Sequence, residues 1–152
     1  MSSSMLDHEW GKEAFNRFPD LLDDFDYVKN PYSLWIELRM EFDEAYETPR
    51  NEDLIARIYD FARWCCSQPR GKTRDDDLMT CVCVCFYEHI PQLPEALEDM
   101  PRWFSHSDVL LMKDVFLYHA GKEGFQRILL ACERYEKQQK KLRKRGGRKR
   151  KS

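Results

Sequence analysis

The strongest constraint on the fold is a pattern of apolar residues spaced three and four apart between residues 31 and 66. Asn30 followed by Pro31 is a favourable N-cap and first helical position. Pro49 ends the first run, and Asn51 can cap a second helix. The two apolar faces consist of Leu34, Trp35, Leu38, Phe42, Ala45 and Tyr46, then Leu54, Ile55, Ile58, Phe61, Ala62 and Cys65. A turn of about four residues between such helices predicts an antiparallel helical hairpin.

The stretch Leu78–Ile90 is apolar on nearly every side, which is typical of a helix at the centre of a bundle. We expect an N-cap at Thr73 or Arg74, with Asp75–Asp77 in the first turn, where negative charge is favourable. The alternation within Cys81–Cys85 is also typical of a strand with three cysteines on one face. The flanking segments, DDDLMT and FYEH, favour the helix.

Proline and serine residues divide the chain beyond this helix. Pro91 and Pro94 end it and open a short irregular segment. Ser105 or Ser107 then caps a helix over residues 108–119. We therefore expect a separate helix between the irregular segment and the glycine that follows it.

The two ends of the chain complete the fold prediction. The last helix begins near Lys122, after Ala120-Gly121 closes the preceding one, and Gly146-Gly147 marks its latest end. Residues 1–30 are less regular, and we expect one or two short helices there, broken at Pro19 and packed on the hairpin. The fold class is therefore all-α, a single helical bundle of five to seven helices with a disordered or fraying basic C-terminal tail.

The net charge of −2 conceals two opposed parts. Residues 137–152 contain ten of the 25 basic residues and no acid, whereas residues 1–136 contain all 27 acidic residues. The chain therefore divides into an acidic helical domain over 1–136, with a net charge of −12, and a basic tail over 137–152. The tail has almost no apolar content and cannot form a core of its own.

The composition of the basic tail favours nucleic-acid binding, because cations displace counterions from the phosphate backbone. No aromatic residue is interleaved for base stacking, so little sequence preference is expected. The tail also resembles a nuclear localisation signal, and the alternative roles are a solubilising tail or one that folds back onto the acidic domain. The candidate contacts are Lys140, Lys141, Arg143, Lys144, Arg145, Arg148, Lys149, Arg150 and Lys151.

The six cysteines offer a candidate for metal or thiol chemistry. On one continuous helix Cys81, Cys85 and His89 lie at i, i+4 and i+8, so that their side chains can converge on a metal ion. A fourth ligand has to come from elsewhere, for instance Cys65 or His119. The ordinary interpretation is that cysteine serves as a small buried apolar residue in a central helix. We therefore expect no metal ligands, no cofactor and no catalytic residues. Enzymatic activity stays open, and the alternative is a metal- or thiol-dependent enzyme that uses Cys81, Cys85 and His89.

Trp103 and Phe104, between Pro101 and Ser105, are large apolar side chains in a connecting segment. Such residues either fill the end of a bundle or anchor a partner. The acidic surface suits a basic macromolecule. We expect a non-enzymatic binding module whose acidic helical body engages a protein partner, with nucleic-acid binding through the tail as the alternative.

The longest uninterrupted apolar runs are four or five residues, as in Val109–Met112, which is too short for a membrane span. The start, MSSSMLDHEW, has neither a basic flank nor an apolar stretch and predicts no signal peptide. The tail has no amphipathic face for an anionic membrane. We expect a cytoplasmic protein.

Three stretches together resemble a group of small bacterial helical domains of unknown function. They are PYSLWIELRMEFDEAY over 31–46, LIARIYDFARWCCSQP over 54–69 and CFYEHIPQLPEALEDMPRWF over 85–104. The resemblance covers about the middle half of the chain and implies an all-helical fold in a bacterial cytosol. It implies no activity, ligand or site residue, and it does not extend to the basic tail.

Overall fold

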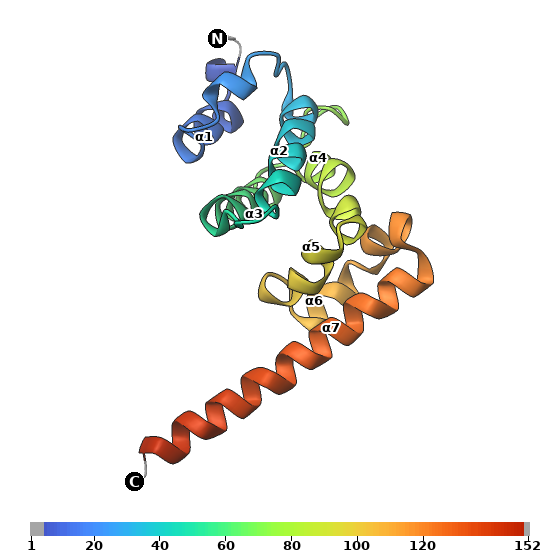
Figure 1. The fold of residues 1–152 in the computed structure, drawn as a ribbon. Coiled ribbons are helices and arrows are strands. Elements are labelled where there is room, and N and C mark those ends of the chain that lie inside the picture. The colour runs from blue at the N-terminus through green and yellow to red at the C-terminus, as the bar shows by residue number, and fades with distance from the viewer. Residues whose placement is uncertain (1–4, 151–152) are drawn as a thin grey trace. The chain divides into compact units, whose positions relative to one another are not determined.

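The computed structural model describes residues 5–150 and contains helices and no strand within that range (Figure 1). The all-α prediction is confirmed, with seven α-helices in the part described, and Cys81–Cys85 is helical rather than extended. The chain forms two compact units, Met1–Tyr87 and Glu88–Ser152, and each is described by itself. No helix in the described range is both long enough and apolar enough to cross a bilayer.

The first unit contains the predicted hairpin. Its elements are η1 (Met5–Asp7), α1 (Glu9–Arg17), η2 (Leu22–Phe25), α2 (Pro31–Ala45), α3 (Glu52–Cys66) and α4 (Leu78–Cys85). Asn30 and Ser33 form a reciprocal capping box in which the Ser33 amide donates to Asn30 Oδ1 at 2.8 Å. Asn51 caps α3, accepting from the Leu54 amide at 3.1 Å. Both predicted caps are therefore confirmed.

A stack of aromatic rings forms the core of the first unit. Trp35 lies between Phe61 and Phe86, with ring centroids 5.4 Å away on each side, and all three are fully buried. Phe42 meets Phe86 edge-on at 4.8 Å. Each such pair contributes about 0.5–1.5 kcal/mol beyond its buried area, and together the rings join α2, α3 and the end of α4.

The start of α4 differs from the prediction. Asp77, rather than Thr73 or Arg74, is the N-cap, and Asp75 and Asp76 belong to the preceding turn instead of the first helical turn. The reason is a local network: the Asp77 carboxylate accepts from the Gly71 amide at 2.8 Å and from Arg70 Nε at 3.0 Å. A Cβ at residue 71 would lie 2.6 Å from the Asp76 carbonyl oxygen, so glycine is required for this close approach.

The end of α4 also differs from the prediction. The helix ends at Cys85, Phe86 has φ −123° and ψ −68°, and a 3₁₀ helix, η3 (Tyr87–Gln92), follows. Pro91 lies inside η3, and an α-helix cannot run through it, because its ring would clash with the Tyr87 carbonyl and it has no N–H to donate. Nothing in the structure explains why the break comes as early as Phe86. The continuous helix expected up to Ile90 does not exist.

The second unit contains α5 (Pro94–Asp99), η4 (Met100–Arg102), α6 (His106–Leu111) and α7 (Lys113–Arg150). Ser105 caps α6 through a capping box with Asp108, which confirms the first of the two predicted caps. The helix expected over 108–119 is interrupted at Met112, where φ is −101° and ψ is 23°. The core residues include Phe104, Val109, Phe116, Phe125, Ile128 and Cys132.

Gly121 divides α7 into two helical segments that meet at a bend. Its φ of 71° and ψ of −178° lie in a region that only glycine enters readily. Figure 1 shows the short orange segment turning there into the long red one. The predicted break at this glycine is confirmed.

The prediction of a disordered or fraying basic tail is wrong for the described residues. The second segment of α7 continues through Gly146-Gly147 to Arg150. Lysine, arginine, glutamine and leucine all have high helix propensity, and cations are favourable at a helix C-terminus. These terms outweigh the charge repulsion on which the prediction rested. Lys151 lies outside the described residues.

Candidate nucleic-acid interface

The second segment of α7 is held at one end only. Phe125, Ile128, Ala131 and Cys132 are buried, and α7 packs on α5, α6 and η4. An ion pair between Arg134 Nη2 and Glu98 Oε2, at 3.1 Å, joins α7 to α5. Gln139 is the last half-buried residue, and all residues from 140 to 147 are exposed.

We call residues 137–150 of α7 the basic segment. Helical rotation of about 100° per residue places most of its cations on one face. The opposite side carries Cys132, Tyr135 and Gln139, which approach the rest of the second unit. The face is formed by Lys137, Lys140, Lys141, Lys144 and Arg145.

Like charges repeat along this face at helical spacing. Lys137 and Lys141, like Lys140 and Lys144, are four residues apart, and each such pair destabilises an isolated helix by about 0.2–0.5 kcal/mol. The favourable term is the helix dipole, which stabilises cations near the C-terminus. An array of phosphates would remove the repulsion without removing the favourable dipole term.

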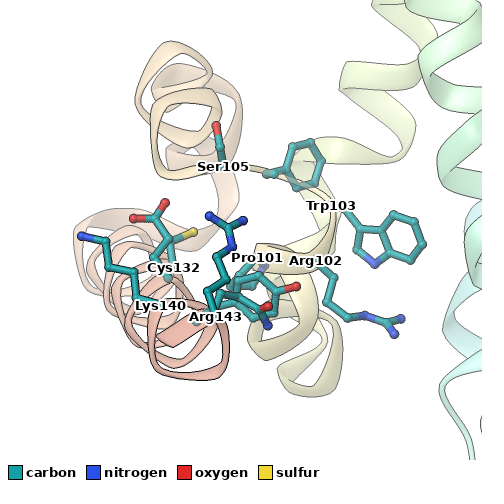
Figure 2. A pocket seen from close by; sticks show the side chains of 11 residues that line it. Pro101, Arg102, Trp103, Ser105, Cys132, Lys140 and Arg143 are labelled. Atoms are coloured by element: carbon teal, nitrogen blue, oxygen red, sulfur yellow. The ribbon is translucent and has the colours of Figure 1, made fainter. Parts of the chain in front are cut away.

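A cavity of about 370 Å³ lies where the basic segment leaves the second unit. Figure 2 shows the Arg143 side chain directed from α7 towards Ser105. The side chains of Arg102 and Trp103 lie on the other side of the Pro101–Ser105 segment, away from α7. Lys140 also lines the cavity. The cavity therefore places cations next to apolar surface at the base of the basic segment.

Of the nine cations predicted to bind nucleic acid, five have described side chains, and all five are exposed: Lys140, Lys141, Arg143, Lys144 and Arg145. Arg148, Lys149 and Arg150 belong to α7, but their side chains lie outside the described residues. Lys151 lies wholly outside the described range. Lys137, which the prediction left out, shares the basic face.

The two predicted partner anchors have different surroundings. Phe104 is buried and meets Phe116 edge-on at 5.2 Å, so it fixes the segment to α7. Trp103 is half-buried, with the Arg102 guanidinium 5.2 Å from its ring centroid. The role of these residues as anchors for a protein partner stays a prediction.

The cysteine environments do not favour nucleophilic chemistry. All six are present as thiols. Burial raises the pKa of Cys81 to about 12 and that of Cys66 to about 11. Reactive cysteines require the opposite shift, so the surroundings of Cys66 and Cys81 disfavour the thiolate form.

The predicted set of Cys81, Cys85 and His89 does not share one helix face, because α4 ends at Cys85. The Cys81 thiol approaches the Arg74 and Asp75 carbonyls, and the Cys85 thiol approaches the Tyr32 carbonyl. His89 instead lies beside Glu88 and His119, with one ligand atom of each within 4.8 Å of the others. The sequence analysis named His89 and offered His119 as a further ligand, but it missed Glu88 and joined the histidines to cysteines that lie elsewhere.

An acidic cluster formed by Asp24, Glu37 and Glu41 was also missed. Glu37 is buried and accepts a hydrogen bond from the Tyr27 hydroxyl. Burial and a hydrogen bond with Asp24 raise the pKa of Glu41 to about 8. Burial, then the bond to Glu37, raises the pKa of Tyr27 to about 12. The spacing of Glu37 and Glu41 on α2 was the available signal, whereas Asp24 comes from η2.

Comparison with protein-family models, with curated proteins and with solved structures finds no match for this chain. The resemblance to small bacterial helical domains therefore stays a prediction.

Proposed function

We propose that this protein binds double-stranded DNA through the basic segment of α7. The observation that carries the proposal is the helical face of exposed cations on a segment held at one end only. An α-helix about 10–12 Å across fits the major groove of DNA, which is about 12 Å wide. Continuous basic helices occupy that groove in other DNA-binding proteins.

Several features favour DNA over other polyanions. Duplex RNA has a deep, narrow major groove that does not admit a helix. Anchoring in an anionic membrane requires an apolar face, and Leu142 is the one large apolar residue among positions 137–147. The basic segment spans about 20 Å at 1.5 Å per residue, which matches several phosphate positions along the groove.

The first experiment measures binding of a fluorescent DNA duplex across a salt series, with matched RNA duplex and anionic vesicles as separate samples. A log–log slope of about −5 or steeper corresponds to about six neutralised phosphates. Replacing Lys140, Lys141 and Lys144 by Gln should weaken DNA binding strongly and reduce the slope. Replacing Lys12, Lys29 and Lys72 by Gln makes the same charge change at exposed sites outside α7 and should have little effect.

A second variant separates helical geometry from charge. Leu142→Pro keeps every cation but interrupts α7 within the basic segment, and we expect weaker binding to the DNA duplex. Leu142→Ala is the matched control and should bind like the wild type. Equal binding by the proline variant would mean that charge alone attaches the segment. No DNA binding at low salt, or stronger binding to vesicles, would contradict the proposal.

A protein partner for the acidic residues of 1–136 stays a separate prediction. Its test is a partner that co-purifies with the chain after removal of residues 137–152. Trp103→Ala should then weaken that complex without unfolding the protein.

A further inference from the structure

Two imidazoles and a carboxylate meet in the second unit. Glu88 and His89 come from η3, and His119 comes from the first segment of α7. The two histidine rings stack with centroids 4.4 Å apart and planes 23° apart. His119 Nε2 lies 3.7 Å from Glu88 Oε2. A simple ion pair needs only one imidazole, so the second histidine requires another explanation.

Gln92 contacts the Nδ1 atom of His89 and can orient the imidazole ring. Its Oε1 lies 2.8 Å from His89 Nδ1. An amide oxygen only accepts, so this contact is a hydrogen bond in the tautomer whose proton is on Nδ1, and that tautomer leaves Nε2 able to bind a metal. Metal-binding histidines almost always donate their second ring N–H in this way, which fixes the tautomer and orients the ring.

The cluster is also accessible. His119 is exposed, and Glu88 and His89 are half-buried. A cavity of about 250 Å³ beside them is lined by His119, Gln92, Glu123 and Arg127. An ion can therefore enter from solvent, and space exists beside the cluster for a further ligand.

We propose that Glu88, His89 and His119 bind one Zn²⁺ ion, with water in the fourth coordination position. Two imidazoles and one carboxylate are a zinc ligand set, whereas calcium and magnesium take oxygen ligands. Tetrahedral zinc with bonds of about 2.0–2.1 Å needs ligand atoms roughly 3.3 Å apart. The three atoms now lie within 4.8 Å of one another, so zinc binding requires the stacked rings to turn towards a shared ion.

The test is Zn²⁺ binding by the full chain, measured after chelator treatment by competition with a chromophoric chelator. We expect one equivalent to bind. His89→Ala and His119→Ala should each weaken the affinity at least tenfold. Gln92→Ala removes only the acceptor for His89 Nδ1 and should weaken it by about 10–100-fold. His106→Ala is the control, because His106 begins α6 outside the cluster, and it should bind zinc like the wild type.

Co²⁺ in place of zinc distinguishes this site from the cysteines. Histidine and carboxylate ligands give weak visible bands, whereas thiolates add an intense near-ultraviolet charge-transfer band. Far-UV circular dichroism establishes that each variant is folded, and Zn²⁺ should raise the melting temperature of the wild type but not of His119→Ala. The proposal is overturned by a thiolate band, by unchanged affinity in folded His89→Ala or His119→Ala, or by no binding.

Discussion

Glu41 lies on α2 among carboxylates, and its pKa is raised from about 4.5 to about 8 by burial and by Asp24. The folded state therefore holds this proton more tightly than the unfolded chain does. Its contribution to stability is complete below pH 4.5 and is lost as the pH rises through 8. We expect Glu41→Gln to remove this loss, so that urea unfolding at pH 8 requires more denaturant than for the wild type. Glu47→Gln, at an exposed position just beyond α2, should keep the wild-type pH dependence.

Asp77 shows the opposite shift. A hydrogen bond from Thr80, then the Gly71 amide and Arg70, lowers its pKa from 3.8 to about 2. Its contribution to stability is present above pH 3.8 and is lost as the pH falls through 2. Asp77→Asn keeps a capping oxygen but not the charge, so its unfolding free energy should fall less between pH 5 and pH 2.

The control for this residue is Asp75→Asn, which removes the same charge from an exposed neighbour. It should leave the acid dependence of unfolding as in the wild type. An equal effect of the two substitutions would mean that general charge in the turn, rather than the network at Asp77, sets the acid stability.

At the scale of elements, Gly121 determines the direction of α7. Nothing lies within 4 Å of the position that a Cβ would occupy, so a substitution acts through the backbone alone. We expect Gly121→Ala to lower the free energy of unfolding by about 1–3 kcal/mol, because φ of 71° is strained for alanine. Gly146→Ala, at a helical position that is equally open, should instead increase helix content in far-UV circular dichroism. Equal effects would contradict the assignment of strain to Gly121.

The helix boundaries that the sequence predicts well are those with a local physical cause. Asn30, Asn51, Ser105 and Gly121 act through bonds or backbone angles within a few residues, and each occupies its expected role. The start of α4 was missed because the Asp77 network includes Gly71, six residues away in a loop. Sequence patterns do not show which of the three aspartates will accept hydrogen bonds from the loop residues Arg70 and Gly71.

Of the two candidate sites, the basic segment follows from local sequence, whereas the histidine cluster depends on tertiary contacts. The basic residues of 137–150 are evident from composition, but the sequence predicts a helix that ends by Gly146-Gly147 at the latest, whereas α7 continues to Arg150. The sequence pattern does not show how far helix propensity and the dipole outweigh charge repulsion. The cluster of Glu88, His89 and His119 depends on how η3 meets α7. That meeting is a tertiary contact within the second unit, which the spacing of the two histidines does not encode.

At the scale of the whole molecule, charge and secondary structure change at different positions. The last acidic residue is Glu136, in the middle of α7, whereas the helix continues to Arg150. The last acidic residues, Glu133 and Glu136, and the basic segment therefore share one helical segment of α7 instead of being joined by a flexible linker. A ligand on the basic segment is connected to the core of the second unit through helical hydrogen bonds.

The one-sided attachment of α7 also sets how its backbone opens. Amides near Cys132 are covered by the core of the second unit, whereas those beyond Gln139 are protected by helical hydrogen bonds alone. Hydrogen–deuterium exchange should therefore be slow near Cys132 and become progressively faster towards Arg150. A polyanion bound to the basic segment would slow exchange most near Arg150, where it is otherwise fastest. The exchange rates along α7 would therefore show how much of the protein is bound, without any label on the partner.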